Sequence, residues 1–533
     1  MRVAFILLYG NSLGERRKSD EKAHDSVSCS PCVFTVAFFA VPIIAAEDVG
    51  PNYGRMAKFL PSNGEISGWI HDLWKIGIKS KYGYRMPGTP ESVEGAKYVL
   101  KKFQEFGLEN TFLEPTPLEV CFPDKWSLKI KVGGKTQEIP SYFLRYTAFT
   151  PPEGIKTQMV YVGKGTKAEF DAAKNTVGIA GKIVAVDVFS AGFPYKALTG
   201  FDWPNSEFTY DPENTLPGST PTGNWPLANL DTSYKLAIQY GAVGYVGIMD
   251  AMWGKVNQYL HWYANDEIPG LSISPDDGEY LRSLLAGGPV ETTMVHTGVR
   301  GVGQTYTVYG FLPGRRADEI IQVVSHHDGW AVNEASGVSV VMAIAKYFSQ
   351  FPKESRERTL MFVAFGSHFG KKAEWNTYPC LAYDLLPNTV VANGIEMVGA
   401  ETEVIDGELF KTGLISPRVF ELSGPVKCAV NPTLLSFAKQ AITKYDLDRS
   451  AVGVPIIGEI MKYQYEGIPV INHISENHPQ FTYADTPQTV MISALRPTAA
   501  AFIDIIKNQD VTPKILMEPV DTSPLFSYLC PPR

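Results

Sequence analysis

The sequence contains no cluster of basic residues, no phosphate-binding loop and no dinucleotide-binding fingerprint among its 533 residues. Its net charge of −8 and pI near 5.7 also disfavour a polyanionic partner. We therefore expect no nucleic-acid partner. The chain has only 6 cysteines, and their spacing is not that of a zinc-binding cysteine cluster. A hydrophobic content of 44% is that of an ordinary globular protein.

Long hydrophobic runs are also absent, with one exception at residues 32–46 (CVFTVAFFAVPIIAA). This run is too short to cross a bilayer comfortably. It follows Arg16 to Lys18 and ends in small residues. Residues 1–46 are therefore interpreted as a secretory signal region with cleavage near Ala45 or Ala46. We expect an exported mature chain, periplasmic or extracellular, with no membrane span; an uncleaved anchor or a buried helix is the alternative.

Four cysteines remain after removal of such a signal. An even number in an oxidising compartment permits disulfides. Plain buried thiols are equally consistent with the sequence. The four are Cys121, Cys380, Cys428 and Cys530.

The length of the chain indicates two or three domains. Residues 47–124 have helical periodicity, which is clearest over 93–106, where Ser92 is expected to cap the helix. Residues 125–300 contain short strand-like runs separated by turns, and we interpret them as an insert. Residues 301–512 alternate strands with helices, and 513–533 form a proline-rich tail. We expect an α/β fold whose mixed, mostly parallel sheet has helices on both faces.

One loop carries several candidate metal ligands between a predicted strand at 320–324 and a predicted helix at 338–349. Ligands of open α/β sheets bind at the carboxyl ends of strands. Imidazoles, a carboxylate and an amide at such a position suggest a metal site, although helix capping would also explain the asparagine. The loop residues concerned are His326, His327, Asp328, Asn333 and Glu334.

Several motifs in order resemble the co-catalytic zinc aminopeptidases, a family that includes bacterial leucyl aminopeptidases, glutamate carboxypeptidase, the transferrin receptor and glutaminyl cyclase. The resemblance covers nearly all of the chain after the signal region. The stretch YRMPGTPES at 84–92 resembles the family's opening turn and helix, and FTYADTPQTV at 481–490 resembles its closing segment. GIAGKIVAV at 178–186 and AIQYGAVGYV at 237–246 resemble a protease-associated domain, which the resemblance places at 125–300.

The resemblance implies specific roles for the residues of the metal loop. His326 corresponds to the family's first histidine ligand, and Asp328 would orient it. The family's bridging aspartate falls on Asn333, a neutral side chain that bridges two dications poorly. One metal ion is therefore expected rather than two. The neighbouring Glu334 is a candidate to supply the negative charge that Asn333 lacks.

The family's glutamate pair also differs in this chain. Ser367 stands at the position of the general base, and His368 at that of a metal-binding glutamate. Imidazole is a good metal ligand, so His368 is expected to bind metal. A serine cannot perform the proton transfer of a tuned carboxylate. Peptidase activity is consequently in doubt.

Later segments supply the remaining candidate ligands. Glu396, in GIEMVG, corresponds to the family's later acidic ligand. His478 is expected to be the closing histidine, with His473 as the alternative. The alternative interpretation of His368 is a histidine of the hydrophobic core. The alternative interpretation of Glu396 is a surface residue at the end of a strand. His71, His261 and His296 lie in the leading or inserted segments and are expected at the surface.

These residues together predict an exported, metal-dependent hydrolase of the aminopeptidase or carboxypeptidase type, acting on a peptide or a small amide. Zinc is the expected cofactor, and iron or another divalent metal is the alternative. A catalytically degenerate binding protein and a non-hydrolytic, histidine-rich metalloenzyme are the alternative functions. The resemblance is compatible with a homodimer.

Overall fold

The fold is described from a computed structural model, and all described residues belong to one unit, Gly50–Arg533. The predicted signal region, Cys428, Cys530 and the side chain of Asn333 lie outside the described part. The described residues are 53–190, 208–217, 227–260, 264, 267–330, 333–371, 380–423, 430–453, 458–475 and 477–518.

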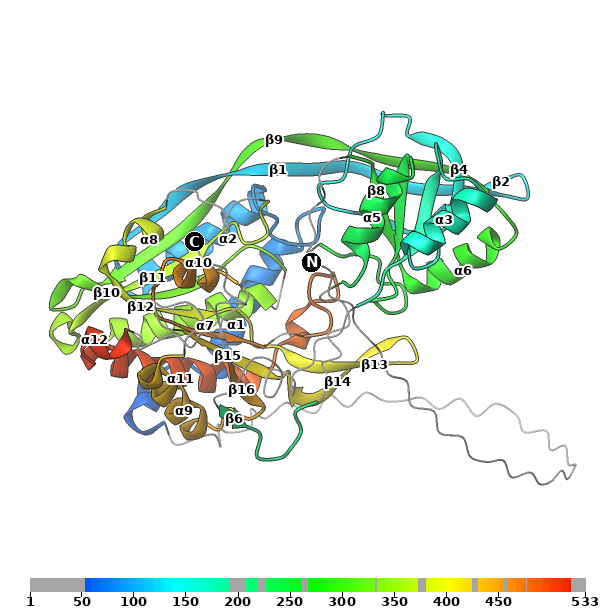
Figure 1. The fold of residues 1–533 in the computed structure, drawn as a ribbon. Coiled ribbons are helices and arrows are strands. Elements are labelled where there is room, and N and C mark those ends of the chain that lie inside the picture. Colours follow the sequence, from blue (N-terminus) through cyan, green and yellow to red (C-terminus); the bar gives the residue numbers. More distant parts are fainter. Residues whose placement is uncertain are drawn as a thin grey trace, which may run out of the picture. The chain divides into compact units, whose positions relative to one another are not determined.

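A single large sheet organises the described chain, and one long strand connects its two halves. The strand order is β3-β8-β7-β5-β4-β9-β11-β10-β12-β17-β15-β16-β6. The early part of β9 (Val290–Leu312) pairs with β4 (Ile155–Tyr161), and its late part pairs with β11 (Arg358–Phe365). Strand β1 (Glu109–Val132) runs antiparallel to β9 along most of its length (Figure 1). The two halves therefore share backbone hydrogen bonds through β9.

The half of the sheet after β9 has a parallel centre, in which β10 (Arg316–His326) pairs with β11 and β12 (Thr389–Ile395), and β12 pairs with β17 (Val470–Ile474). Its strands are buried on both faces, which explains their continuous hydrophobic runs. The remaining strands of this region are β6 (Phe208–Tyr210), β15 (Arg418–Ser423), β16 (Ser450–Gly453) and the separate hairpin β13 (Ala400–Ile405) and β14 (Glu408–Ile415).

Helices cover both faces of this half. One face packs against five long helices and the short α12 (Lys514–Met517), and alternate strand residues such as Val323 point into this core. The opposite face, which includes Val324, packs against two shorter helices. The first set is α1 (Asn63–Gly77), α2 (Pro90–Glu105), α7 (Asn333–Ser349), α9 (Pro432–Lys444) and α11 (Ile492–Val511); the second is α8 (Leu381–Asp384) and α10 (Ile460–Tyr465).

Local chemistry sets the start of α2 earlier than we expected. The Thr89 hydroxyl, rather than that of Ser92, caps the helix and accepts from the Ser92 N–H at 3.3 Å. Pro90 occupies the first helical position, where its missing N–H has no cost. The proline and its preceding threonine therefore move the start of the helix into the turn-rich motif.

Most of the described residues between β1 and β9 form the other half of the sheet, with three helices; β6 instead pairs with β16 at the far edge of the sheet. Strands β4, β5, β7 and β8 are mutually parallel neighbours, and β3 pairs antiparallel with β8. His296, expected at the surface, is buried here between Phe143 and Phe149. The elements are β2 (Lys135–Ile139), β3 (Ser141–Phe143), β5 (Ile183–Asp187), β7 (Gly244–Ile248), β8 (Gly270–Ile273), α3 (Lys167–Thr176), α5 (Leu230–Gln239) and α6 (Pro275–Leu285).

The predicted fold class, a mixed and mostly parallel sheet with helices on both faces, is confirmed. The identity of 125–300 as a protease-associated domain remains a prediction. Cys121 and Cys380 are buried thiols. Within the described residues, no helix combines the length and hydropathy needed to cross a bilayer.

Candidate metal centre

Two neighbouring parallel strands bring His326 and His368 to the same edge of the sheet. His326 is the last residue of β10 and lies opposite Phe365, the last residue of β11. His368 follows three residues later, after the strand has ended. The two imidazole rings are stacked, with centroids 4.1 Å apart and planes 12° from parallel. The parallel register therefore brings together two histidines that are distant in sequence.

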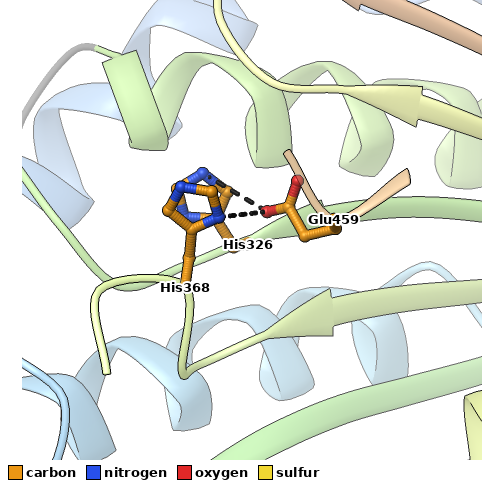
Figure 2. Close-up of side chains that lie close together, drawn as sticks. All are labelled: His326, His368 and Glu459. Atoms are coloured by element: carbon orange, nitrogen blue, oxygen red, sulfur yellow. Dashed lines mark ion pairs between the residues drawn. The ribbon is translucent and has the colours of Figure 1, made fainter. Parts of the chain in front are cut away.

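A third residue, Glu459, completes the group from the position just before α10 (Figure 2). Its Oε1 lies 3.4 Å from Nε2 of His326 and 3.3 Å from Nδ1 of His368. His326 and Glu459 are almost fully buried, and the His368 side chain is 10% exposed. The sequence did not single out Glu459. Among the described residues, these three form the group whose ligand atoms lie within 4.8 Å of one another.

The geometry of the three side chains fits one zinc ion. Ligand atoms about 2.0–2.1 Å from a tetrahedral zinc are about 3.3–3.4 Å from one another. The two contacts of Glu459 Oε1, at 3.4 and 3.3 Å, match that spacing. This buried oxygen accepts no hydrogen bond, which is costly unless a cation or proton compensates it. Two imidazoles and one carboxylate also form a common zinc ligand set.

Asp328 lies on the other side of His326, as its predicted orienting role requires. Its Oδ1 is 3.3 Å from Nδ1 of His326, and its Oδ2 accepts from the Phe369 N–H at 2.8 Å. Burial opposes ionisation of Asp328, but the neighbouring His326 and His368 hold its pKa below the usual value. Such a carboxylate–histidine pair fixes the ring and leaves Nε2 facing the metal position.

The carboxyl group of Glu459 is also kept ionised. Burial opposes its ionisation, whereas the charges of His326 and His368 lower its pKa to about 2. A ligand carboxylate must be deprotonated to bind metal. The centre therefore has its anionic ligand in the charge state that metal binding needs.

Arg85 of the opening motif holds the metal loop in place. Its fully buried guanidinium donates to the carbonyls of His327, Trp330 and Leu73, at 2.6, 2.7 and 2.9 Å. The backbone of Arg85 also pairs with that of Gly329. The motif and the metal loop, which the sequence could only relate through the resemblance, are thus in direct contact.

Glu334 is fully buried at the start of α7. Its Oε2 accepts from the Trp330 N–H at 3.1 Å. Burial and the charge of Asp485 raise the pKa of Glu334 well above its ordinary value, although the charge of His368 acts in the opposite direction. The side chain therefore holds its proton more tightly than an exposed glutamate does.

The structure places the other predicted site residues as follows. Ser367 is buried beside His368. Glu396 is buried just after β12, and its carboxylate lies against the backbone of Gly458, the neighbour of Glu459. Asn333 begins α7.

Neither candidate closing histidine belongs to the group of three. His478 packs edge-on against Trp253, with ring centroids 5.1 Å apart. His473 is buried on β17 against Phe420 and Phe502. Burial lowers the pKa of His473 to about 3, as expected for a core imidazole. The acidic residue grouped with the two histidines is therefore Glu459, whereas we had expected Glu396 together with a closing histidine.

Sequence comparison gives no relatives: no family model matches the chain, and no curated protein matches it. Solved structures do match. An aminopeptidase from Aneurinibacillus sp. strain AM-1 aligns over 87% of this chain and 98% of its own, with 17% identity and a TM-score of 0.55. A peptidase M28 precursor from Shewanella amazonensis SB2B covers 89% of this chain and 100% of its own, with 18% identity and a TM-score of 0.58.

A third match is BSAP, a zinc aminopeptidase from Bacillus subtilis, over 84% of this chain and 95% of its own, at 15% identity and a TM-score of 0.56. The chain has the fold of the zinc aminopeptidases. Identities this low establish the fold and leave the chemistry to the site itself. The fold nevertheless agrees with the resemblance seen in the motifs, and the trio His326, His368 and Glu459 lies at the strand ends where α/β sheets bind ligands.

Proposed function

We propose that this protein is an exported, metal-dependent hydrolase that binds one zinc ion through His326, His368 and Glu459 and acts on a peptide or small amide bond. The observation that carries the proposal is the spacing of these three buried ligand atoms. The zinc-aminopeptidase fold supports it. The neutral Asn333 supports one ion rather than two.

The residues around the trio have separable tasks. His326 presents Nε2 because Asp328 occupies the Nδ1 side of the ring. These three ligands would hold zinc, which would supply Lewis acidity for the hydrolysis. Arg85 keeps the loop between the histidine and α7 in place. The three ligand side chains are thus almost fully buried, and electrostatic interactions are stronger in such an environment than in water.

Glu334 is the carboxyl group that we assign to proton transfer. Ser367 cannot act as a base. Glu401, a second carboxylate that we considered as a replacement for the missing base, is engaged by Arg449 through two hydrogen bonds. Glu334 is buried beside the metal loop, and burial and the charge of Asp485 raise its pKa in the direction that suits a proton carrier near neutral pH.

A binding protein that has lost catalysis is the second candidate, and Ser367 at the position of the family's base is the observation that favours it. Such a protein would keep the zinc centre or its fold without hydrolysing its ligand. The ligand set also suits iron or copper, and a non-hydrolytic metalloenzyme would follow if the purified protein contained one of these metals.

Hydrolysis of a panel of aminoacyl, carboxyl-terminal and small-amide substrates tests the proposal. We expect slow turnover by the zinc-loaded protein and none after chelation. Ser367→Glu should raise the rate, because it restores a carboxylate where the family's base stands, and Glu334→Gln should lower it. Turnover that survives chelation would contradict metal dependence. No turnover with zinc at full occupancy would contradict hydrolysis and favour the binding protein.

A further inference from the structure

We infer that Arg145 and Tyr146, two consecutive residues of the segment 125–300, are positioning residues for the metal centre. Through them, that segment holds the loop that carries His368. The inference rests on the proposed zinc centre and concerns its affinity for metal.

Arg145 connects the segment to the residue next to a ligand. Its side chain is buried and donates from Nη1 to the Leu260 carbonyl at 3.0 Å and from Nη2 to the Phe369 carbonyl. Phe369 directly follows His368, and its own N–H donates to Asp328 at 2.8 Å. The backbone of Phe369 is therefore held at its carbonyl by the inserted segment and at its N–H by the carboxylate that orients His326.

Tyr146 fixes the same loop two residues further on. Its hydroxyl donates to the Glu119 carbonyl at 3.0 Å and accepts from the Lys371 N–H at 3.3 Å. The backbones of Glu119 and Lys371 also form a bridge. Arg145 and Tyr146 thus act on the two ends of the short stretch from Phe369 to Lys371.

The backbone of Tyr146 indicates that this arrangement is costly. Its φ of 57° lies in the left-handed region, which is unfavourable for a bulky aromatic residue. Such a conformation persists only where the surroundings over-determine it, and it is commonest at functional sites. Here it places two consecutive side chains on the same loop.

The ring contacts explain why a small movement of the loop would affect metal binding. The Phe369 ring meets the imidazole of His368 at 4.7 Å and that of His326 at 5.7 Å between centroids. Displacement of Phe369 would therefore shift His368 through the connecting backbone. It would also shift both His368 and His326 through the packing of their rings against Phe369. Loss of partners outside the ligand set commonly weakens metal binding 10–100-fold.

The test measures Zn²⁺ affinity by competition with a chromophoric chelator, and the visible absorption of the Co²⁺-loaded protein, in the full chain. We expect Arg145→Met to bind Zn²⁺ about tenfold more weakly and to change the Co²⁺ spectrum. Arg145→Lys, which keeps one donor, should recover part of the affinity. Tyr146→Phe should weaken binding about threefold, because it removes only the hydroxyl's hydrogen bonds.

Arg356→Met is the matched control. Arg356 is also a buried arginine that donates to backbone carbonyls, those of Phe348 and Phe351, but it precedes β11 at the end opposite the centre. This variant should lose stability and keep the wild-type affinity and Co²⁺ spectrum.

The possible outcomes distinguish failure of the proposed function from failure of the inference about Arg145 and Tyr146. A wild-type protein that binds no Zn²⁺ would overturn the proposed function, and this inference with it. Wild-type binding with Arg145→Met and Tyr146→Phe within twofold of it would overturn the inference and leave the proposed function intact. If Arg145→Met does not fold, Arg145→Lys and Tyr146→Phe decide the question.

Discussion

Buried arginines connect separate segments of this chain by donating to backbone carbonyls. Arg85 does so for the metal loop, Arg145 for the loop after His368, and Arg356 for the turn before β11. A guanidinium suits this role because its fixed fork of donors can satisfy several carbonyls that no regular secondary structure pairs. The charge is costly to bury, and burial lowers the pKa of Arg85 to about 10.

Removal of the Arg85 side chain should therefore be severely destabilising. Arg85→Met leaves three carbonyls without their donor, and we expect the free energy of unfolding to fall by about 3–5 kcal/mol in urea titrations. Arg315→Met is the control, because the Arg315 side chain is 57% exposed and its 2.8 Å ion pair with Glu357 contributes at most about 1 kcal/mol. Equal losses in both variants would show that the Arg85 contacts contribute little.

His296 makes stability depend on pH through its burial. Burial, with a smaller effect of the Arg300 charge, lowers the pKa of His296 to about 3, whereas an unfolded imidazole titrates near about 6.5. Between these values the unfolded chain binds the extra proton. The contribution of the neutral His296 to the free energy of unfolding is therefore fully present above about pH 6.5. It is lost as the pH falls, by up to about 1.4 kcal/mol per pH unit.

His296→Phe should remove this part of the acid sensitivity while keeping the aromatic contacts with Phe143 and Phe149. We expect the free energy of unfolding to fall less steeply between pH 6.5 and 5 than in the wild type. Parallel pH profiles for the two proteins would mean that His296 is not held neutral by the fold.

At the scale of the elements, the turn before α10 places Glu459. Gly458 has a φ of +82°, and a Cβ on it would lie 1.2 Å from Oε1 of Glu396. The glycine thus allows the backbone to approach the Glu396 carboxylate and brings Glu459 to the histidines. Any side chain at position 458 would displace one of these two glutamates.

Gly458→Ala should accordingly weaken Zn²⁺ binding at least about tenfold, an effect of the size seen when residues supporting metal ligands are lost. Gly413→Ala is the matched control, because Gly413 has a φ of +88° with nothing within 4 Å of its Cβ position. That control should lose about 1–2 kcal/mol of stability through backbone strain alone. Isothermal titration with Zn²⁺ measures the difference, and similar affinities would contradict the role of Gly458.

Most elements near the site could be predicted from local pattern, because β10, β11 and α7 have uninterrupted hydrophobic runs or faces. Glu459 could not, since no His, Cys, Asp or Glu lies within about six residues of it and metal-ligand patterns depend on spacing. His478 was a reasonable expectation from the closing motif, but its ring lies against Trp253 instead. Such contacts depend on tertiary packing, which a single sequence does not encode locally.

At the scale of the whole molecule, β9 makes the segment 125–300 continuous with the rest of the sheet. It pairs with β4 at one end and β11 at the other. Arg145 and Tyr146 add contacts to the loop beside the metal centre. The segment is therefore expected to influence the metal centre.

Export remains a prediction that concerns the whole chain. The apolar run at 32–46 and its small-residue end motivate it. We expect the mature protein from its native host to begin near Ala46 or Glu47, as read by amino-terminal sequencing. Mature protein that retains residues 1–30 would contradict a cleaved signal.

The central claim is that His326, His368 and Glu459 hold one metal ion, and metal stoichiometry tests it most directly. Elemental analysis of purified wild type, His326→Ala, His368→Ala and Glu459→Gln should give one zinc per chain in the wild type and strongly reduced occupancy in each variant. His478→Ala should retain the full occupancy, because His478 lies against Trp253. No bound divalent metal in the wild type, or full occupancy in His368→Ala, would contradict the account.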